Sequence, residues 1–145
     1  MAVDVEKSSG RGEAGTAARW RVGDFNGVMT VDLFAGLRVR EYAAALGWYE
    51  RFFGGEPAFV PNDVEAVWEV GERQYVYIEE SPERAGCGLV TVFVEDLDGV
   101  VEGIAARGIE PVERETYENG VRKVTYRDPD GNEIGYGGGP VDGDG

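Results

Sequence analysis

The sequence predicts an α+β domain built from two tandem βαβββ modules. The chain has 145 residues, 42% of them hydrophobic, which is enough for one domain with a packed core. A strand followed by a helical stripe occurs twice, about 55 residues apart. Three strand-like runs follow each stripe. Because the same order of one strand, one helical stripe and three strands occurs twice, the pattern indicates a duplicated unit.

Each copy of the pattern starts with a strand that ends in an acidic residue. In the first copy the acid is Glu41, and the helical stripe that follows comprises Tyr42, Ala45, Leu46, Trp48, Tyr49, Phe52 and Phe53. In the second copy the acid is Asp96, and the stripe comprises Leu97, Val100, Val101 and Ile104. An acid at a helix start opposes the positive end of the helix dipole favourably. Gly54 and Gly108 stand where glycine commonly ends a helix, and each begins a segment that ends in Glu-Pro.

The runs after each helix alternate as strands do. We expect strands over residues 58–61, 65–70 and 74–79 in the first copy, and over 111–116, 121–127 and 133–137 in the second. Asn119-Gly120 marks a tight turn, and the segment from Asp128 to Asn132 is a dense turn cluster. The domain is therefore expected to span residues 29–137, with module one at 32–80 and module two at 88–137.

Both ends of the chain differ in composition from this domain. Residues 1–28 are rich in Gly, Ala, Ser and charge, and we expect a disordered N-terminal extension. Its large apolar residues are Trp20 and Phe25, which would have to dock on the domain to be ordered. Met29 is an alternative start. Residues 138–145 are rich in Gly and Asp, and we expect a flexible tail.

The absence of histidine and the scarcity of cysteine exclude several common types of catalytic and metal site. The chain has no histidine and one cysteine, Cys87. Triads that use histidine, zinc or iron sites with histidine ligands, and thiolate metal sites are therefore excluded. No intrachain disulfide can form, no apolar stretch is long enough to cross a membrane, and the N-terminus lacks a signal-peptide core. We expect a cytoplasmic protein without a cofactor.

The charge is strongly negative. The net charge is −14, with 28 acidic and 14 basic residues. Four acidic and four basic residues fall in 1–28, and two acidic residues fall in the tail, so the domain keeps 22 acidic and 10 basic residues, a net −12. Such a field repels nucleic acids and anionic membranes, so neither is expected as a partner. It favours a cationic ligand, although solubility alone would also account for it.

The paired βαβββ plan with its Asp-Pro-Asp-Gly-Asn turn resembles the vicinal-oxygen-chelate superfamily, which includes glyoxalases, bleomycin-resistance proteins and dioxygenases. The resemblance covers residues 32–137, and is most telling over 37–54 and 126–134. It implies curved mixed sheets paired around a cleft, and a homodimer, because members commonly complete or brace their clefts across a two-fold axis. Members include metal-dependent isomerases, dioxygenases and thiol transferases, and metal-free proteins that sequester antibiotics.

The resemblance also implies that a metal site has been lost. The superfamily's four metal ligands correspond here to Phe34, Leu89, Gly135 and a fourth residue, for which Tyr77 is the best register and Glu79 an alternative. Phe34, Leu89 and Gly135 have no side chain that can bind a metal. At most one of the four positions keeps a ligand, so we expect no metal.

Alternation along the strands predicts which residues face the cleft. If Gly71-Glu72 is the turn of its hairpin, Trp68 pairs with Tyr75 and shares its face. The expected ligand-binding residues are Phe34, Arg38, Trp68, Tyr75, Tyr77, Leu89, Phe93 and Thr125. Aromatic rings on this face could stack on a planar ligand, or they could simply be core or dimer packing. The aromatic residues of the first helical stripe, together with Tyr126 and Tyr136, are assigned to packing.

Three functions remain open at this stage. The leading hypothesis is a metal-free, bleomycin-resistance-like protein that binds an aromatic or cationic small molecule, and the resemblance implies that this molecule is an antibiotic. The alternative is a metal-free isomerase or cyclase, with Glu69, Glu79 and Tyr77 as acid–base candidates. The third is a metal-dependent lyase of the glyoxalase or dioxygenase type. An enzyme needs two titratable groups that converge in the cleft, whereas a binding protein needs only shape and stacking.

Overall fold

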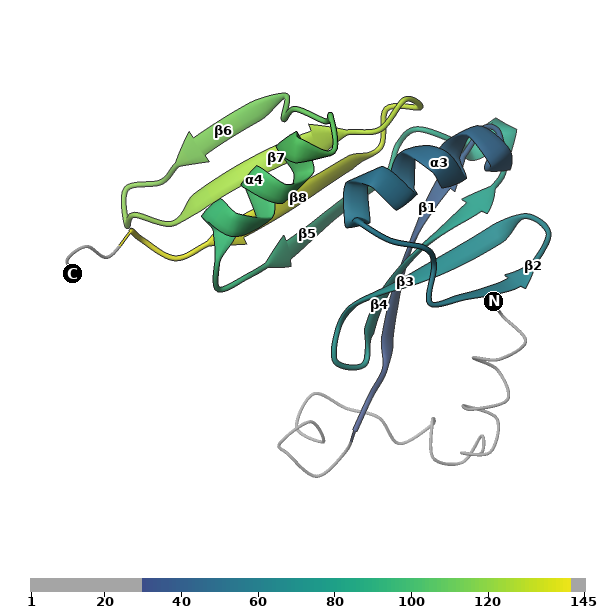
Figure 1. Cartoon of the computed structure of the whole chain (residues 1–145), viewed down its shortest axis with the longest axis horizontal. Coiled ribbons are helices and arrows are strands. Elements are labelled where there is room, and N and C mark those ends of the chain that lie inside the picture. The colour runs from purple at the N-terminus through teal and green to yellow at the C-terminus, as the bar shows by residue number, and fades with distance from the viewer. Residues whose placement is uncertain (1–29, 142–145) are drawn as a thin grey trace.

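The computed structural model describes residues 30–141, which form two modules in chain order (Figure 1). Module one consists of β1 (Leu33–Val39), α3 (Tyr42–Phe53), β2 (Phe59–Asn62), β3 (Glu65–Gly71) and β4 (Gln74–Glu80). Module two consists of β5 (Leu89–Phe93), α4 (Leu97–Ala106), β6 (Glu113–Thr116), β7 (Arg122–Arg127) and β8 (Glu133–Gly138). A short 3-10 helix, η2 (Pro82–Arg84), lies between them. The predicted α+β fold of two βαβββ modules is confirmed.

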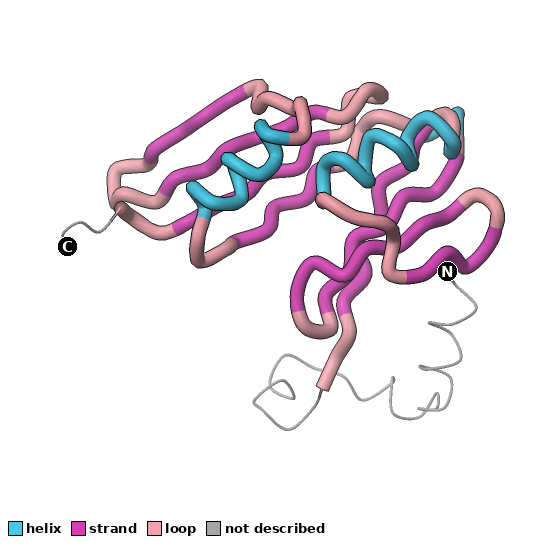
Figure 2. Tube along the Cα trace, in the orientation of Figure 1, coloured by secondary structure: helices cyan, strands magenta, loops and turns pink. Residues whose placement is uncertain are grey.

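Each module forms a four-stranded mixed sheet. The strand orders are β1-β4-β3-β2 and β5-β8-β7-β6, so the two sheets have the same topology. The first strand of each module pairs in parallel with the last, and the remaining pairs are antiparallel. Figure 2 shows one helix across one side of each sheet. The side of each sheet that faces away from its helix is called its open face below.

The main difference from the expected boundaries is at the end of the domain. β1 begins at Leu33, one residue after the expected start of module one, and Leu33 to Gly36 pair with the first half of β4. β8 continues to Gly138, which pairs with Arg122 and is buried, so the expected tail from residue 138 begins too early. The disordered extension expected over residues 1–28 lies outside the described residues.

The two helix starts differ although both were predicted from an acidic residue. The Asp96 side chain accepts a hydrogen bond from the backbone N–H of Gly99 at 3.0 Å and caps α4. Glu41 occupies the same position before α3 but makes no side-chain cap. Aspartate is among the preferred N-cap residues, whereas glutamate, with a side chain one methylene longer, is not. Both predicted helix ends are confirmed as left-handed glycines, with φ of 87° at Gly54 and 91° at Gly108.

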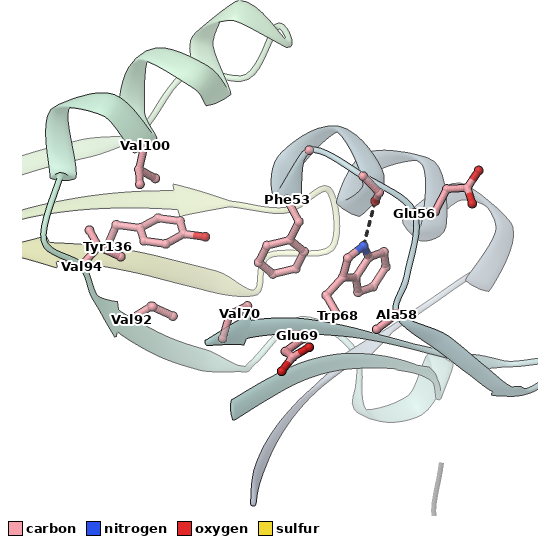
Figure 3. A pocket seen from close by; sticks show the side chains of 12 residues that line it. Phe53, Glu56, Ala58, Trp68, Glu69, Val70, Val92, Val94, Val100 and Tyr136 are labelled. Atoms are coloured by element: carbon pink, nitrogen blue, oxygen red, sulfur yellow. Dashed lines mark hydrogen bonds between the residues drawn. The ribbon is translucent and has the colours of Figure 1, made fainter. Parts of the chain in front are cut away.

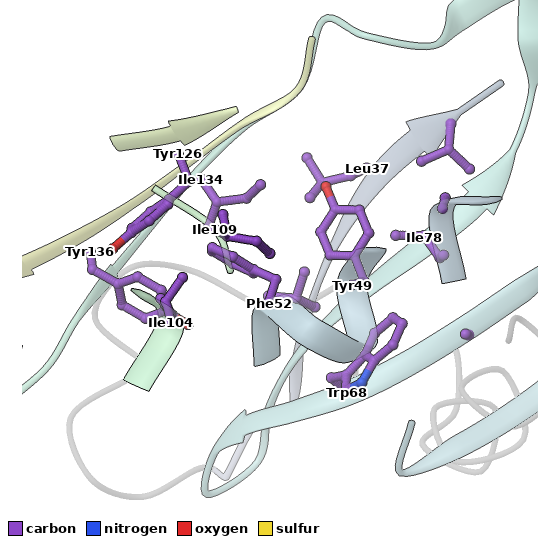
Figure 4. Close-up of a cluster of buried hydrophobic side chains, with 14 of the residues drawn as sticks. Leu37, Tyr49, Phe52, Trp68, Ile78, Ile104, Ile109, Tyr126, Ile134 and Tyr136 are labelled. Atoms are coloured by element: carbon purple, nitrogen blue, oxygen red, sulfur yellow. The ribbon is translucent and has the colours of Figure 1, made fainter. Parts of the chain in front are cut away.

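One hydrophobic core joins both modules. The stripe on α3 packs on sheet one through Tyr49, and also reaches module two through Phe52 (Figure 4). The ring of Phe52 lies 5.2 Å from that of Tyr126 and 5.8 Å from that of Tyr136. These aromatic residues were assigned to packing from the sequence, and they are buried here. Because α3 serves both sheets, neither module has a separate core.

The Asp-Pro-Asp-Gly-Asn turn fastens the modules together. Asp128 accepts hydrogen bonds from the Tyr49 hydroxyl at 2.7 Å and from the backbone N–H groups of Asp130 and Asn132 at 2.9 Å each. Burial, followed by the charge of Asp128, raises the pKa of Tyr49. The phenol therefore keeps its proton and remains the donor. A second link comes from Arg107 at the end of α4, which donates to the last carbonyls of α3, those of Arg51 and Phe52.

No helix among the described residues is long and apolar enough to cross a membrane.

Candidate functional site

The open face of sheet one carries a row of aromatic side chains. The pairing of β1 with β4 places Phe34 opposite Tyr75, Gly36 opposite Tyr77, and Arg38 opposite Glu79. These residues alternate with Leu37, Val76 and Ile78, which are buried on the helix side. Sequence reasoning assigned Phe34, Arg38, Tyr75 and Tyr77 to this face, and the structure places them there.

Aromatic contacts on this face are close. The rings of Phe34 and Tyr75 are stacked, with centroids 4.5 Å apart and planes 14° from parallel. Phe59 on β2 meets Tyr75 edge-on at 6.3 Å. The Tyr77 ring covers Gly36, where an added Cβ would lie 2.5 Å from the ring carbon Cζ. Because Gly36 has no side chain, the Tyr77 ring has room to lie over it.

Trp68 does not belong to this face. It pairs with Val76, is 4% exposed on the helix side, and packs on Phe53 with ring centroids 5.4 Å apart. The hairpin turn is Glu72-Arg73 rather than Gly71-Glu72, and the pairing is irregular between Glu69 and Gly71. A register error of one residue moves every side chain to the other face. The predicted position of Trp68 beside Tyr75 is therefore wrong.

Sequence reasoning missed three residues that this register brings to the open face, namely Phe59, Glu65 and Val67. Glu65 pairs with Glu79, and Val67 pairs with both Tyr77 and Phe59. Val67 and Glu65 are buried there, beneath the aromatic row. Glu65, Val67 and Glu69 alternate along the sequence, but their face depends on the irregular pairing between Glu69 and Gly71, which the sequence does not reveal.

The open face of sheet two carries two large apolar side chains that are exposed. Leu89 is 66% exposed and Phe93 is 64% exposed, and both lie on β5 with Thr91 between them. Thr125 on β7 shares this face, because Thr91 and Thr125 both pair with Gly135. The structure thus places Leu89, Phe93 and Thr125 on the expected face, although Thr125 is buried.

Lys123 is a feature of this face that the sequence did not single out as a site residue. An added Cβ at Gly135 would lie 2.8 Å from Cε of Lys123 and 3.6 Å from Oγ1 of Thr91. The lysine side chain therefore crosses the space that Gly135 leaves free. The clue to Lys123 in the sequence is Gly135, because a glycine leaves room for a neighbouring side chain. In the sequence, Gly135 was interpreted only as the loss of a metal ligand.

The residues at the positions corresponding to the superfamily's metal ligands do not fit a metal. Phe34 and Leu89 hold equivalent positions on the first strands of the two modules, and Tyr77 and Gly135 hold equivalent positions on the last strands. These four residues offer one phenol oxygen between them. Among residues 30–141 no three Asp, Glu, Cys or His side chains are arranged to hold a metal ion.

The acid–base candidates lie on the open face of sheet one, and only two are neighbours along a strand. Tyr77 and Glu79 are both on β4, and Glu79 forms an ion pair with Arg38 at 3.6 Å. Burial, then the charges of Glu79 and Glu65, raises the pKa of Tyr77, so the phenol is protonated at neutral pH. Glu69 is exposed, near the end of β3 and opposite Tyr75.

A pocket of about 380 Å³ lies elsewhere, between the two modules on the helix side (Figure 3). Trp68 and Phe53 line it from module one, and Val100 and Tyr136 line it from module two. Glu69 is at its edge. Two of the residues predicted for the cleft therefore line a pocket, but a different one.

The fold and the faces described above define a two-module domain of the glyoxalase and bleomycin-resistance type. The model of the Glyoxalase/Bleomycin resistance protein/Dioxygenase superfamily matches residues 30–136, and the chain belongs to this superfamily. No curated protein matches the sequence.

Solved structures agree with this assignment. A glyoxalase/bleomycin resistance protein from Catenulispora acidiphila is 51% identical, with a TM-score of 0.74 over 77% of this chain and 100% of that one. A lactoylglutathione lyase from Agrobacterium tumefaciens is 22% identical, with a TM-score of 0.63 over 77% and 95% of the two chains. A bleomycin-binding protein complexed with bleomycin is 17% identical, with a TM-score of 0.61 over 77% and 98%. The last two likenesses show the fold alone.

Proposed function

We propose that the protein binds small molecules in the manner of the bleomycin-resistance proteins, and holds a flat aromatic or cationic compound against the open face of sheet one. The observation that carries this proposal is the aromatic row of Phe34, Tyr75 and Tyr77, in which Phe34 and Tyr77 stand at positions where a metal-dependent relative would need ligands. A ring that stacks on this row gains about 0.5–1.5 kcal/mol beyond the burial of its area. The net charge of −14 favours a cation over an anion.

The proposal includes a homodimer whose two chains share the cleft. Within one chain the helices pack into a common core, which leaves the open faces of both sheets uncovered. Leu89 and Phe93 are about two-thirds exposed, and large apolar side chains on an uncovered face favour a partner. The second sheet of one chain, laid over the first sheet of another, would cover Leu89 and Phe93 and enclose the aromatic row.

A metal-free isomerase or cyclase is the second hypothesis. It is favoured by one observation, the placing of the protonated phenol of Tyr77 next to Glu79 on the same face of β4. Such a phenol could donate a proton while a carboxylate accepts one. Glu79, however, already pairs with Arg38, which lowers its availability as a base. The binding hypothesis needs no such group and is preferred.

Equilibrium titration with two probes, bleomycin and the flat cationic dye proflavine, tests the proposal. We expect at least one probe to bind the wild type and its affinity to fall about tenfold in Tyr77→Ala, because losing a stacking surface and its buried area costs about 1.4 kcal/mol. Tyr117→Ala is the control, because Tyr117 is 44% exposed after β6 and off the proposed face. The absence of binding by either probe at millimolar concentration, or equal affinities of Tyr77→Ala and the wild type, would contradict the proposal.

A further inference from the structure

We propose that the pocket between the modules is a second binding site, which takes a small organic cation with an aromatic body. We call it the inter-module pocket. It lies on the helix side of the sheets, whereas the proposed cleft lies on their open faces. The two sites have only Glu69 in common, which pairs with Tyr75 on the open face and lies at the edge of this pocket. Their aromatic walls are separate, so either site can exist without the other.

The size and walls of the pocket suit a small ligand. Its volume of about 380 Å³ falls in the range of about 300–1,000 Å³ that is usual for small-molecule sites. Module two contributes Val92, Val94 and Val100, which are only half-buried. Figure 3 shows these valines across the pocket from Phe53 and Trp68. A bound aromatic body would remove this remaining apolar surface from water.

The aromatic wall is fixed before any ligand arrives. The indole N–H of Trp68 donates a hydrogen bond to the carbonyl of Gly55 at 3.0 Å, and Gly55 also lines the pocket. Phe53 packs against the same indole. The adjacent Gly54 turn is covered by Arg107, whose guanidinium also donates to the end of α3. Binding would therefore require little ordering of this wall.

Charge selects the class of ligand. Glu56 and Glu69 are the charged residues that line the pocket, and no lysine or arginine is among the lining residues. Over residues 30–141 neither carboxylate takes part in a hydrogen bond or an ion pair. Burial raises the pKa of Tyr136 to about 12, so its phenol adds no charge at neutral pH. Aromatic faces together with two free carboxylates favour a cation and disfavour an anion.

The test uses the full chain and 1-naphthylmethylamine, which is a cation at neutral pH, with the neutral 1-naphthylmethanol for comparison. The chain has three tryptophans, so a ¹H–¹⁵N NMR spectrum resolves three indole signals, and Trp68→Phe identifies that of Trp68. We expect the amine to shift the Trp68 signal and to bind more tightly than the alcohol. Val100→Phe, which fills the pocket from a half-buried position, should abolish the shift, whereas Tyr77→Ala should leave it unchanged.

The carboxylates are tested by a pair of variants matched in charge. Glu56→Gln/Glu69→Gln should weaken binding of the amine about fivefold and leave the alcohol unaffected, because two partly solvated charge interactions are lost. Glu83→Gln/Glu118→Gln removes two exposed carboxylates elsewhere and should leave both affinities unchanged. The proposal is overturned if the amine leaves the Trp68 signal in place at millimolar concentration, if Val100→Phe binds as the wild type does, or if the two double variants behave alike.

Discussion

Asn132 is a fully buried polar residue that joins the two modules. Its side-chain amide donates to the carbonyl of Arg38 at 2.8 Å and to Oδ2 of Asp128 at 2.9 Å. Its side-chain carbonyl accepts from the backbone N–H of Gly88 at 2.7 Å. The exposed fraction of Asn132 is 0%, so no water replaces these bonds if the side chain is lost. The Asp-Pro-Asp-Gly-Asn turn, on which the family resemblance partly depends, thus stabilises the packing of the two modules in this chain.

Replacing Asn132 should therefore destabilise the whole domain. We expect Asn132→Ala to lower the free energy of unfolding by about 2–4 kcal/mol, because several buried polar groups lose their partners. Asn119→Ala is a matched control at an exposed turn, where the side chain accepts one hydrogen bond from Val121, and should cost less than about 1 kcal/mol. Urea unfolding of both variants measures the difference. Equal losses would show that the buried network adds little.

Single residues were predicted well where alternation alone decided the face. Phe34, Tyr75 and Tyr77 are on the face that β1 and β4 imply, because their neighbours Leu37, Val76 and Ile78 are plainly apolar. Trp68 could not be placed in this way. Its strand contains an irregularity before Gly71, and the turn residue Arg73 has a positive φ of 63°, which no sequence rule for glycine turns would select.

The helix starts show how local chemistry sets the strength of an element. Asp96 and Glu41 occupy equivalent positions, yet only Asp96 caps its helix through the side chain. Asp96→Ala should lower the free energy of unfolding by about 1 kcal/mol, because it leaves an N–H of the first turn of α4 unpaired. Glu41→Ala should cost no more than a few tenths of a kcal/mol, since only an interaction with the helix dipole is lost. Thermal unfolding of the two variants compares them, and an equal or larger loss for Glu41→Ala would refute the assignment.

The order and type of the elements could be read from the sequence because each depends on short-range patterns. The two helical stripes, their glycine ends and the Asn119-Gly120 turn are all local features, and the structure has them where expected. The inter-module pocket is not local. It combines the end of α3 with β3, β5 and α4, and the packing of α3 against module two determines whether it exists.

At the scale of the molecule, the shared core decides which surfaces remain for binding. Phe52 inserts between the modules, and Arg107 and the Asp128 turn hold them together. Apart from the inter-module pocket, the helix sides of both sheets are thereby used for folding, while the open faces keep Leu89 and Phe93 exposed. This division is the basis of the proposal that a second copy of the chain completes the cleft.

Sedimentation velocity of the protein mixed with proflavine tests this shared cleft most directly, because it reports mass and bound dye together. The wild type should sediment as a dimer that carries dye. Leu89→Glu/Phe93→Glu should sediment as a monomer without dye, although sheet one is untouched. The control Val60→Glu/Val112→Glu changes two valines that are 51% and 50% exposed, and should remain a dimer with dye. A wild-type monomer that carries dye, or a Leu89→Glu/Phe93→Glu variant that binds dye as the wild type does, would contradict the account.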